Sequence, residues 1–172
     1  METEQDIAGR KKKQQWLLSL LFDNRISAHK YILRTGLISL IPSLIISFIL
    51  GFLGIMNEET SPDIQGSALF LFVGMVVIGP PIETLLMGPI LKLLSFMTKY
   101  KVRLAIMSAF VWAVVHSLLA PAWGLGVFWP FFVFSCSYLN WRRQAWWRAV
   151  LITSGVHAFQ NFLPTVLVII YL

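Results

Sequence analysis

Charged residues are scarce in this sequence, and long stretches of it contain none. Only 13% of the 172 residues are charged, whereas 57% are hydrophobic and the mean hydropathy is +0.72. This composition excludes an ordinary soluble globular domain, which needs far more polar surface. The net charge of +6 does not indicate a nucleic-acid partner either, because the basic residues flank the apolar stretches.

Cysteine is equally scarce, since Cys136 is the only one. A single cysteine excludes an internal disulfide, and its place inside an apolar stretch indicates a packing role. The sequence also shows no internal repeat and no segment with the composition of a soluble domain.

The apolar stretches are long enough to cross a bilayer, which takes roughly 20 helical residues. Residues 104–141 contain no Lys, Arg, Asp or Glu and would measure about 57 Å as one helix, so they must turn back near Pro121 and Gly124. We predict an all-α, multi-pass transmembrane helical bundle with about five spans, at 36–56, 67–97, 104–120, 122–141 and 149–172. Residues 1–35 are predicted to form a cytoplasmic basic arm with an interfacial helix.

The basic residues predict how the chain is oriented. They fall in three segments that would share one side of the membrane: Arg10 to Lys13 with Arg25, Lys30 and Arg34; Lys99, Lys101 and Arg103; and Arg142, Arg143 and Arg148. The loop on the other side, 57–66, holds three acidic residues and no base. By the positive-inside rule the N-terminus is cytoplasmic, in a cell membrane.

Glu83 is the only acidic residue expected inside a span. A carboxylate at mid-membrane costs about 2.5 to 3.5 kcal/mol and persists mainly where it faces a partner or a water-filled cavity. Residues 67–97 would measure about 46 Å as a straight helix, so tilting or a break must absorb the excess length. Pro80 and Pro81 favour a break just before Glu83, and a new helix half starting there would stabilise the ionised carboxylate.

Three further polar residues are predicted at a similar depth. His157 and Asn161 lie four residues apart, on one helical face, and Trp112 lies one turn before His116, where it would wall the same pocket. Counted from the basic side, the four polar residues lie about 12 to 21 Å deep. One membrane histidine commonly bonds a neighbouring helix, but this set of four on three spans favours a functional site.

The four residues suit peptide hydrolysis, which needs a base near a water and donors facing the developing oxyanion. Glu83 and His116 would activate the water, and His157 and Asn161 would form the oxyanion hole. Zinc held by the glutamate and both histidines is the alternative, although no second carboxylate would then remain as base. The sequence therefore favours catalysis without a metal or other cofactor.

These residues resemble the motifs of the CAAX-protease and bacteriocin-processing (CPBP) family of intramembrane glutamic endopeptidases, earlier described as abortive-infection proteins. The matching segments are Pro80 to Thr84, Trp112 to His116 and His157 to Asn161. The resemblance implies the same division of roles between the two pairs. Thr84 stands where the family has a second Glu, Gly88 where it has an Arg, and Trp112 where Phe is more common.

From the residues and the resemblance together we expect an intramembrane endopeptidase acting on a peptide or membrane-protein substrate, in a bacterial inner membrane. Thr84 and Gly88 leave a second expectation open, a catalytically silent relative that binds a peptide or gives immunity to a bacteriocin. The buried Glu and His residues leave a third, a small proton-coupled transporter.

Overall fold

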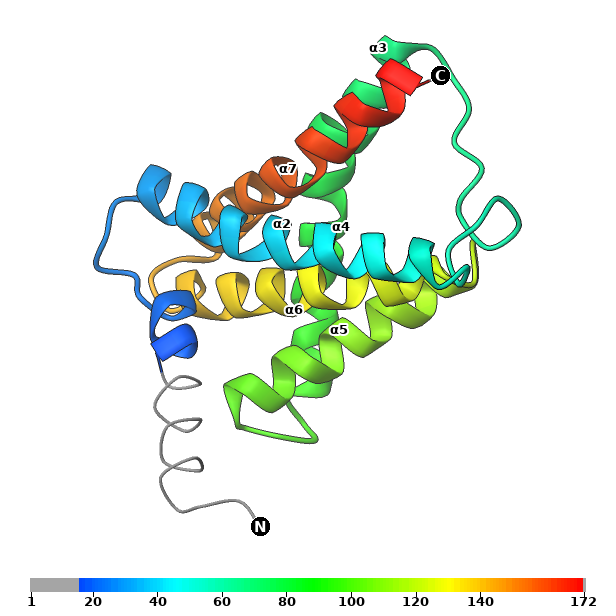
Figure 1. Cartoon of the computed structure of the whole chain (residues 1–172). Coiled ribbons are helices and arrows are strands. Elements are labelled where there is room, and N and C mark those ends of the chain that lie inside the picture. Colours follow the sequence, from blue (N-terminus) through cyan, green and yellow to red (C-terminus); the bar gives the residue numbers. More distant parts are fainter. Residues whose placement is uncertain (1–15, 172) are drawn as a thin grey trace.

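The computed structural model describes residues 16–171, in which helices cross one another at steep angles (Figure 1). After a helical turn at 16–21, its elements are α2 (Ala28–Phe52), α3 (Ala68–Phe72), the π-helix η1 (Val73–Ile78), α4 (Gly79–Leu94), α5 (Lys101–Ser117), α6 (Trp123–Trp141) and α7 (Trp146–Tyr171). This described part contains no strand, which confirms the all-helical prediction. Residues 1–15 of the predicted basic arm lie outside it.

Three helical segments are long and apolar enough to cross a membrane, and they indicate a membrane protein. They are Ala28–Phe52, Ala68–Leu94 and Trp146–Tyr171, which overlap the first, second and fifth predicted spans. The third and fourth predicted spans are also helical, as α5 and α6, but these helices of 17 and 19 residues do not reach the same length and apolarity. A bundle of five spans therefore stays a prediction.

Helix α2 turns its small and polar side chains inward and its large apolar side chains outward. Its buried residues are Tyr31, Thr35, Gly36, Ser39, Leu40 and Ser43. Its exposed apolar residues include Leu33, Leu37, Ile41, Ile45, Phe48 and Phe52. This arrangement is typical of membrane helices, because small residues allow close packing between helices while apolar ones face lipid.

Helix α6 forms the centre of the bundle and is in contact with α2, α4, α5 and α7. Most of its residues are buried, as expected of a helix that is apolar on all sides. Its first turn lies directly against α5, where a Cβ atom at Gly124 would collide with the carbonyl oxygen of Ala113 and the hydroxyl of Ser117. A glycine is therefore required for this contact.

The basic segments meet at one end of the bundle. The Lys101 ammonium lies 5.5 Å from the ring centroid of Phe22. In the turn between α6 and α7, the Gln144 amide donates to the carbonyl of Asn24 at 3.4 Å. The acidic loop 57–66 lies at the other end, hydrogen-bonded to the turn between α5 and α6. The charges are thus separated as predicted from the sequence, and the end that faces the cytoplasm stays a prediction.

The N-terminal turn at 16–21 is held by hydrogen bonds from α2. The Tyr31 hydroxyl donates to the carbonyl of Leu21 at 2.6 Å, and both residues are fully buried. Arg34 donates to the carbonyl of Leu20 at 2.6 Å and also lies 3.4 Å from the Asp23 carboxylate. The backbone N–H of Arg25 bonds the same carboxylate, and this bond lowers the pKa of Asp23.

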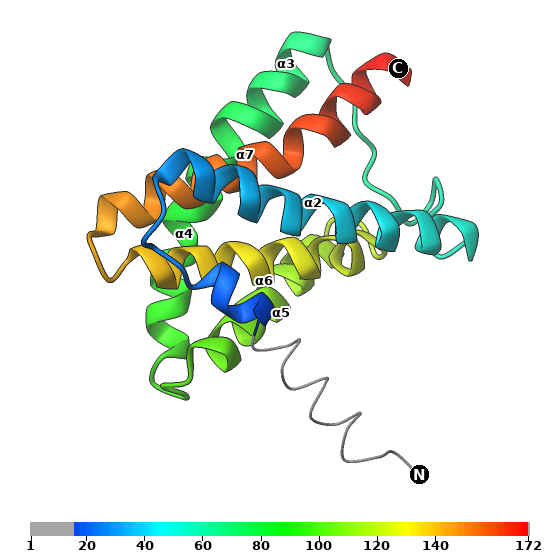
Figure 2. The ribbon, with the colours of Figure 1, turned by 60° about the vertical axis from the view of Figure 1, so that its left-hand side comes forward.

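The helical rod from Ala68 to Leu94 bends at η1, between α3 and α4 (Figure 2). Within η1 the N–H of Gly79 bonds to the carbonyl of Gly74, five residues back. Pro80 and Pro81 have no N–H, so the carbonyls of Met75 and Val76 receive no helical donor. The prolines thus produce a π-helical bend within a continuous helix. The new helix start with free N–H groups, expected as one outcome of the Pro-Pro pair, does not occur.

One of these two carbonyls is bonded from α7. The side-chain Nδ2 of Asn161 donates to the Met75 carbonyl at 2.9 Å. A carbonyl without a donor in an apolar environment is costly, so this bond fixes α7 against the bend.

We expect Asn161→Leu to lower the free energy of unfolding by about 1 to 3 kcal/mol, because it leaves the Met75 carbonyl without a donor. In a Pro80→Ala background the loss is expected to be smaller, since the new N–H at position 80 can bond the carbonyls of η1. Denaturant unfolding of the unaltered protein, the two single variants and the double variant in detergent gives the coupling energy. An equal loss in both backgrounds would contradict the assigned role.

Tyr31→Phe is expected to destabilise the protein by about 1 to 3 kcal/mol, because it leaves the Leu21 carbonyl buried without a donor. Tyr100→Phe is the matched control, since Tyr100 is 69% exposed and is expected to change the melting temperature little. Thermal unfolding in detergent compares the two, and equal shifts would argue against a stabilising Tyr31 bond.

Candidate functional site

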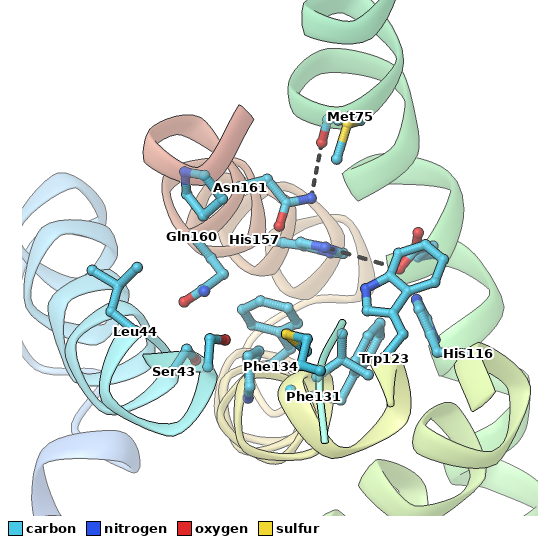
Figure 3. A pocket seen from close by; sticks show the side chains of 17 residues that line it. Ser43, Leu44, Met75, His116, Trp123, Phe131, Phe134, His157, Gln160 and Asn161 are labelled. Atoms are coloured by element: carbon cyan, nitrogen blue, oxygen red, sulfur yellow. Dashed lines mark hydrogen bonds and ion pairs between the residues drawn. The ribbon is translucent and has the colours of Figure 1, made fainter. Parts of the chain in front are cut away.

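The four polar residues predicted from the sequence line a single cavity of about 190 Å³. Glu83 comes from α4. His116 comes from the end of α5, and His157 and Asn161 come from α7 (Figure 3). This volume is large enough to hold several water molecules. The fold therefore brings together residues that lie up to 78 positions apart in the sequence.

The His116 ring is oriented by the backbone of its own helix. Its Nδ1 lies 2.8 Å from the carbonyl oxygen of Trp112. Because a carbonyl only accepts, Nδ1 carries the proton, and the neutral ring keeps its lone pair on Nε2. His116 can therefore accept a proton at Nε2.

Trp112 supports the site in a different way from the one predicted. Its ring does not line the cavity but stacks on Phe131, with centroids 4.7 Å apart. Trp112 acts on His116 through its carbonyl, which any residue type at that position would supply.

His157 lies close to the Glu83 carboxylate. Its Nε2 lies 3.8 Å from Glu83 Oε2, longer than a hydrogen bond. The ring stacks on Phe134 at 4.3 Å between centroids, and its Nδ1 is buried without a partner. Buried N–H groups without acceptors are rarer than acceptors without donors, so we assign the ring proton to Nε2, which faces Glu83.

The structure thus pairs Glu83 with His157 more closely than with His116. No ion-pair contact joins Glu83 and His116 within residues 16–171. The ring of Phe131 contacts both histidines, with centroids 5.1 Å from His116 and 5.6 Å from His157. Both imidazoles are therefore held against the same aromatic side chain.

Asn161 both links α7 to the bend at η1 and lines the cavity. One hydrogen of its amide nitrogen is used in the bond to Met75, as Figure 3 shows. A carboxamide has a second N–H and two acceptor positions, which leaves a donor available to a ligand.

Sequence reasoning missed the polar residues on the side of the cavity toward α2. Gln160 is only 6% exposed, its Oε1 has no partner, and its side chain points toward Ser43 (Figure 3). Ser43 and Ser47 of α2 also line the cavity. Their signal is a polar residue at every fourth position of α2, from Tyr31 to Ser47, which places them on one face.

The two positions that depart from the family pattern are part of the packing. Thr84 is fully buried and does not line the cavity. A Cβ at Gly88 would lie 2.5 Å from the Tyr138 hydroxyl. The space where the resemblance places an arginine is therefore closed by α6, and an arginine there would displace Tyr138.

The zinc alternative considered from the sequence stays a prediction. Within residues 16–171, no three His, Cys, Asp or Glu side chains are grouped closely enough to hold a metal ion. Glu83 and His157 are close to each other, but His116 does not complete the set.

Comparison with known proteins identifies no relative. No family model, curated protein or solved structure matches this chain. The resemblance to the CPBP family therefore rests on the residues of its three motifs alone.

Proposed function

We propose that the protein is an intramembrane endopeptidase that hydrolyses a peptide bond of a peptide or membrane-protein substrate. The observation that carries this proposal is the convergence of Glu83, His116, His157 and Asn161 on one cavity among apolar helices. Ionisable groups are costly in such surroundings and persist mainly at functional sites.

In the proposed mechanism, Glu83 and the free Nε2 of His116 take a proton from a water bound in the cavity. The water oxygen attacks the peptide carbonyl carbon, and the carbonyl oxygen becomes an oxyanion. The Nε2–H of His157 and the second amide hydrogen of Asn161 donate to it. Return of the proton to the leaving nitrogen breaks the peptide bond.

The walls of the cavity support this chemistry. The Trp123 ring meets the His116 ring edge to face at 4.7 Å, and Phe131 and Phe134 hold His157. These rings lower the local polarity, which strengthens hydrogen bonds to a developing charge. The Glu83 side chain keeps 29% of its surface exposed, so it is not sealed inside the bundle.

The packing of Thr84 and Gly88 favours a second candidate, a silent relative that binds a peptide, as in bacteriocin immunity. Thr84 is fully buried, and a side chain at position 88 would displace the Tyr138 hydroxyl, so the larger side chains of the family pattern would require repacking at both positions. In this case the cavity would bind a peptide without cleaving it, and loss of the Glu83 charge would leave the phenotype intact.

Glu83→Gln and His116→Ala are each expected to lower cleavage by about 10² to 10⁴, the usual contribution of a general base. Proteoliposomes would be incubated with a library of apolar peptides, and new termini identified by mass spectrometry. Glu59→Gln is the matched control, because it removes an exposed carboxylate from the loop 57–66. Cleavage that persists in both site variants would contradict the mechanism.

His157→Phe is expected to lower kcat by about 10² to 10³ and to change KM little, because it keeps the stacking on Phe134 but removes the oxyanion donor. Steady-state kinetics on a peptide found in the library experiment measures the two parameters separately. A rise in KM at unchanged kcat would instead assign His157 to substrate binding.

A further inference from the structure

A second hollow, of about 700 Å³, lies at the basic end of the bundle, away from the four-residue cavity. It is bordered by the C-terminal half of α4, the start of α5, the end of α6 and the first residue of α7. Its polar lining consists of Lys92, Ser95, Tyr138, Arg142 and Trp146. No residue of the proposed catalytic set takes part in it.

Two cations at this hollow have no acidic partner. Lys92 lies in the last turn of α4 and Arg142 caps the end of α6, and both side chains are exposed. Within residues 16–171, no carboxylate lies within ion-pair distance of either. Cations at helix C-termini also interact favourably with the helix dipole. That interaction explains the position of Lys92 and Arg142 in sequence, but it does not explain the hollow between them.

The hydrogen-bonding groups beside these cations are mainly donors. Tyr138 lines the hollow together with Arg142 and Trp146, and Tyr138 as a whole is only 4% exposed. An ammonium, a guanidinium, a phenol and an indole N–H together suit an oxyanion with several acceptor oxygens, such as a phosphate. The Tyr138 hydroxyl packs directly against Gly88, which also lines the hollow.

The remaining lining is apolar and continues onto the lipid-facing surface. Leu91 and Leu104 are buried in the hollow, while Leu93 and Phe96 on the same segment are 69% and 79% exposed. Trp146 is 53% exposed at the edge, as is common for tryptophan at a membrane interface. A basic rim above an apolar wall matches a ligand with an anionic head and a hydrocarbon tail.

We propose that this hollow binds the headgroup of an anionic phospholipid from the leaflet at the basic end, with Lys92 and Arg142 on its phosphate. The bound lipid would bridge the ends of α4 and α6, and so brace the helix that carries Glu83. This proposal does not depend on the peptidase function.

The test uses the full-length protein in a neutral detergent, with phosphatidylglycerol or phosphatidylcholine of the same acyl chains added, and native mass spectrometry to measure bound lipid. Lys92→Gln with Arg142→Gln is expected to weaken phosphatidylglycerol binding about tenfold or more. Lys30→Gln with Arg143→Gln removes the same charge from the same end, at two exposed residues that do not line the hollow, and is expected to weaken phosphatidylglycerol binding less than threefold.

Equal weakening in both double variants, or equal binding of the two lipids by the unaltered protein, would overturn the proposal. Inorganic phosphate that displaces the lipid and alone raises the melting temperature as much would identify a free-phosphate site instead. Tyr138→Phe provides a variant that keeps the charges and the ring, and is expected to weaken phosphatidylglycerol binding two- to fivefold. Unchanged binding in this variant would show that the Tyr138 hydroxyl does not contact the lipid.

Discussion

The structure depends on one constraint, that every backbone carbonyl in an apolar environment needs a donor. Pro80 and Pro81 lack the N–H groups that would bond two backbone carbonyls of the long helix 68–94. The helix forms a π-helical bend at this point, and the Asn161 side chain donates to the Met75 carbonyl. This bond sets the rotation of α7 about its axis. Since His157 lies one turn earlier on the same face, the bond also brings His157 to Glu83.

The apolar packing then determines what each polar group can do. Helix α6 supplies Phe131 and Phe134, which hold both imidazoles, and the backbone of α5 fixes the tautomer of His116. The two histidines therefore differ in role because of their surroundings, one with a free lone pair and the other with a proton facing the carboxylate.

Much of the fold and site could be predicted from the sequence, because a few polar residues in long apolar stretches are conspicuous. The helices, the separation of basic and acidic ends and the grouping of Glu83 with His116, His157 and Asn161 all follow from residue type and spacing. The catalytic roles of these residues stay predictions.

Other features could not be predicted, for physical reasons. A Pro-Pro pair is compatible with a break, a new helix start or a π-helix, and only contacts with α7 decide between them. The serines of α2 are also ordinary packing residues in membrane helices, so their place at the cavity depends on how α2 rotates. Gln160 was missed because its neighbour Asn161 fits the recognised motif.

The bond between Asn161 and Met75 also divides the cavity into two mechanical parts. Glu83 and His157 belong to helices tied together at the bend, whereas His116 belongs to α5, which packs mainly on α6. A rigid-body shift of the α5 and α6 pair would therefore change the separation of His116 from Glu83 while the separation of Glu83 from His157 is preserved.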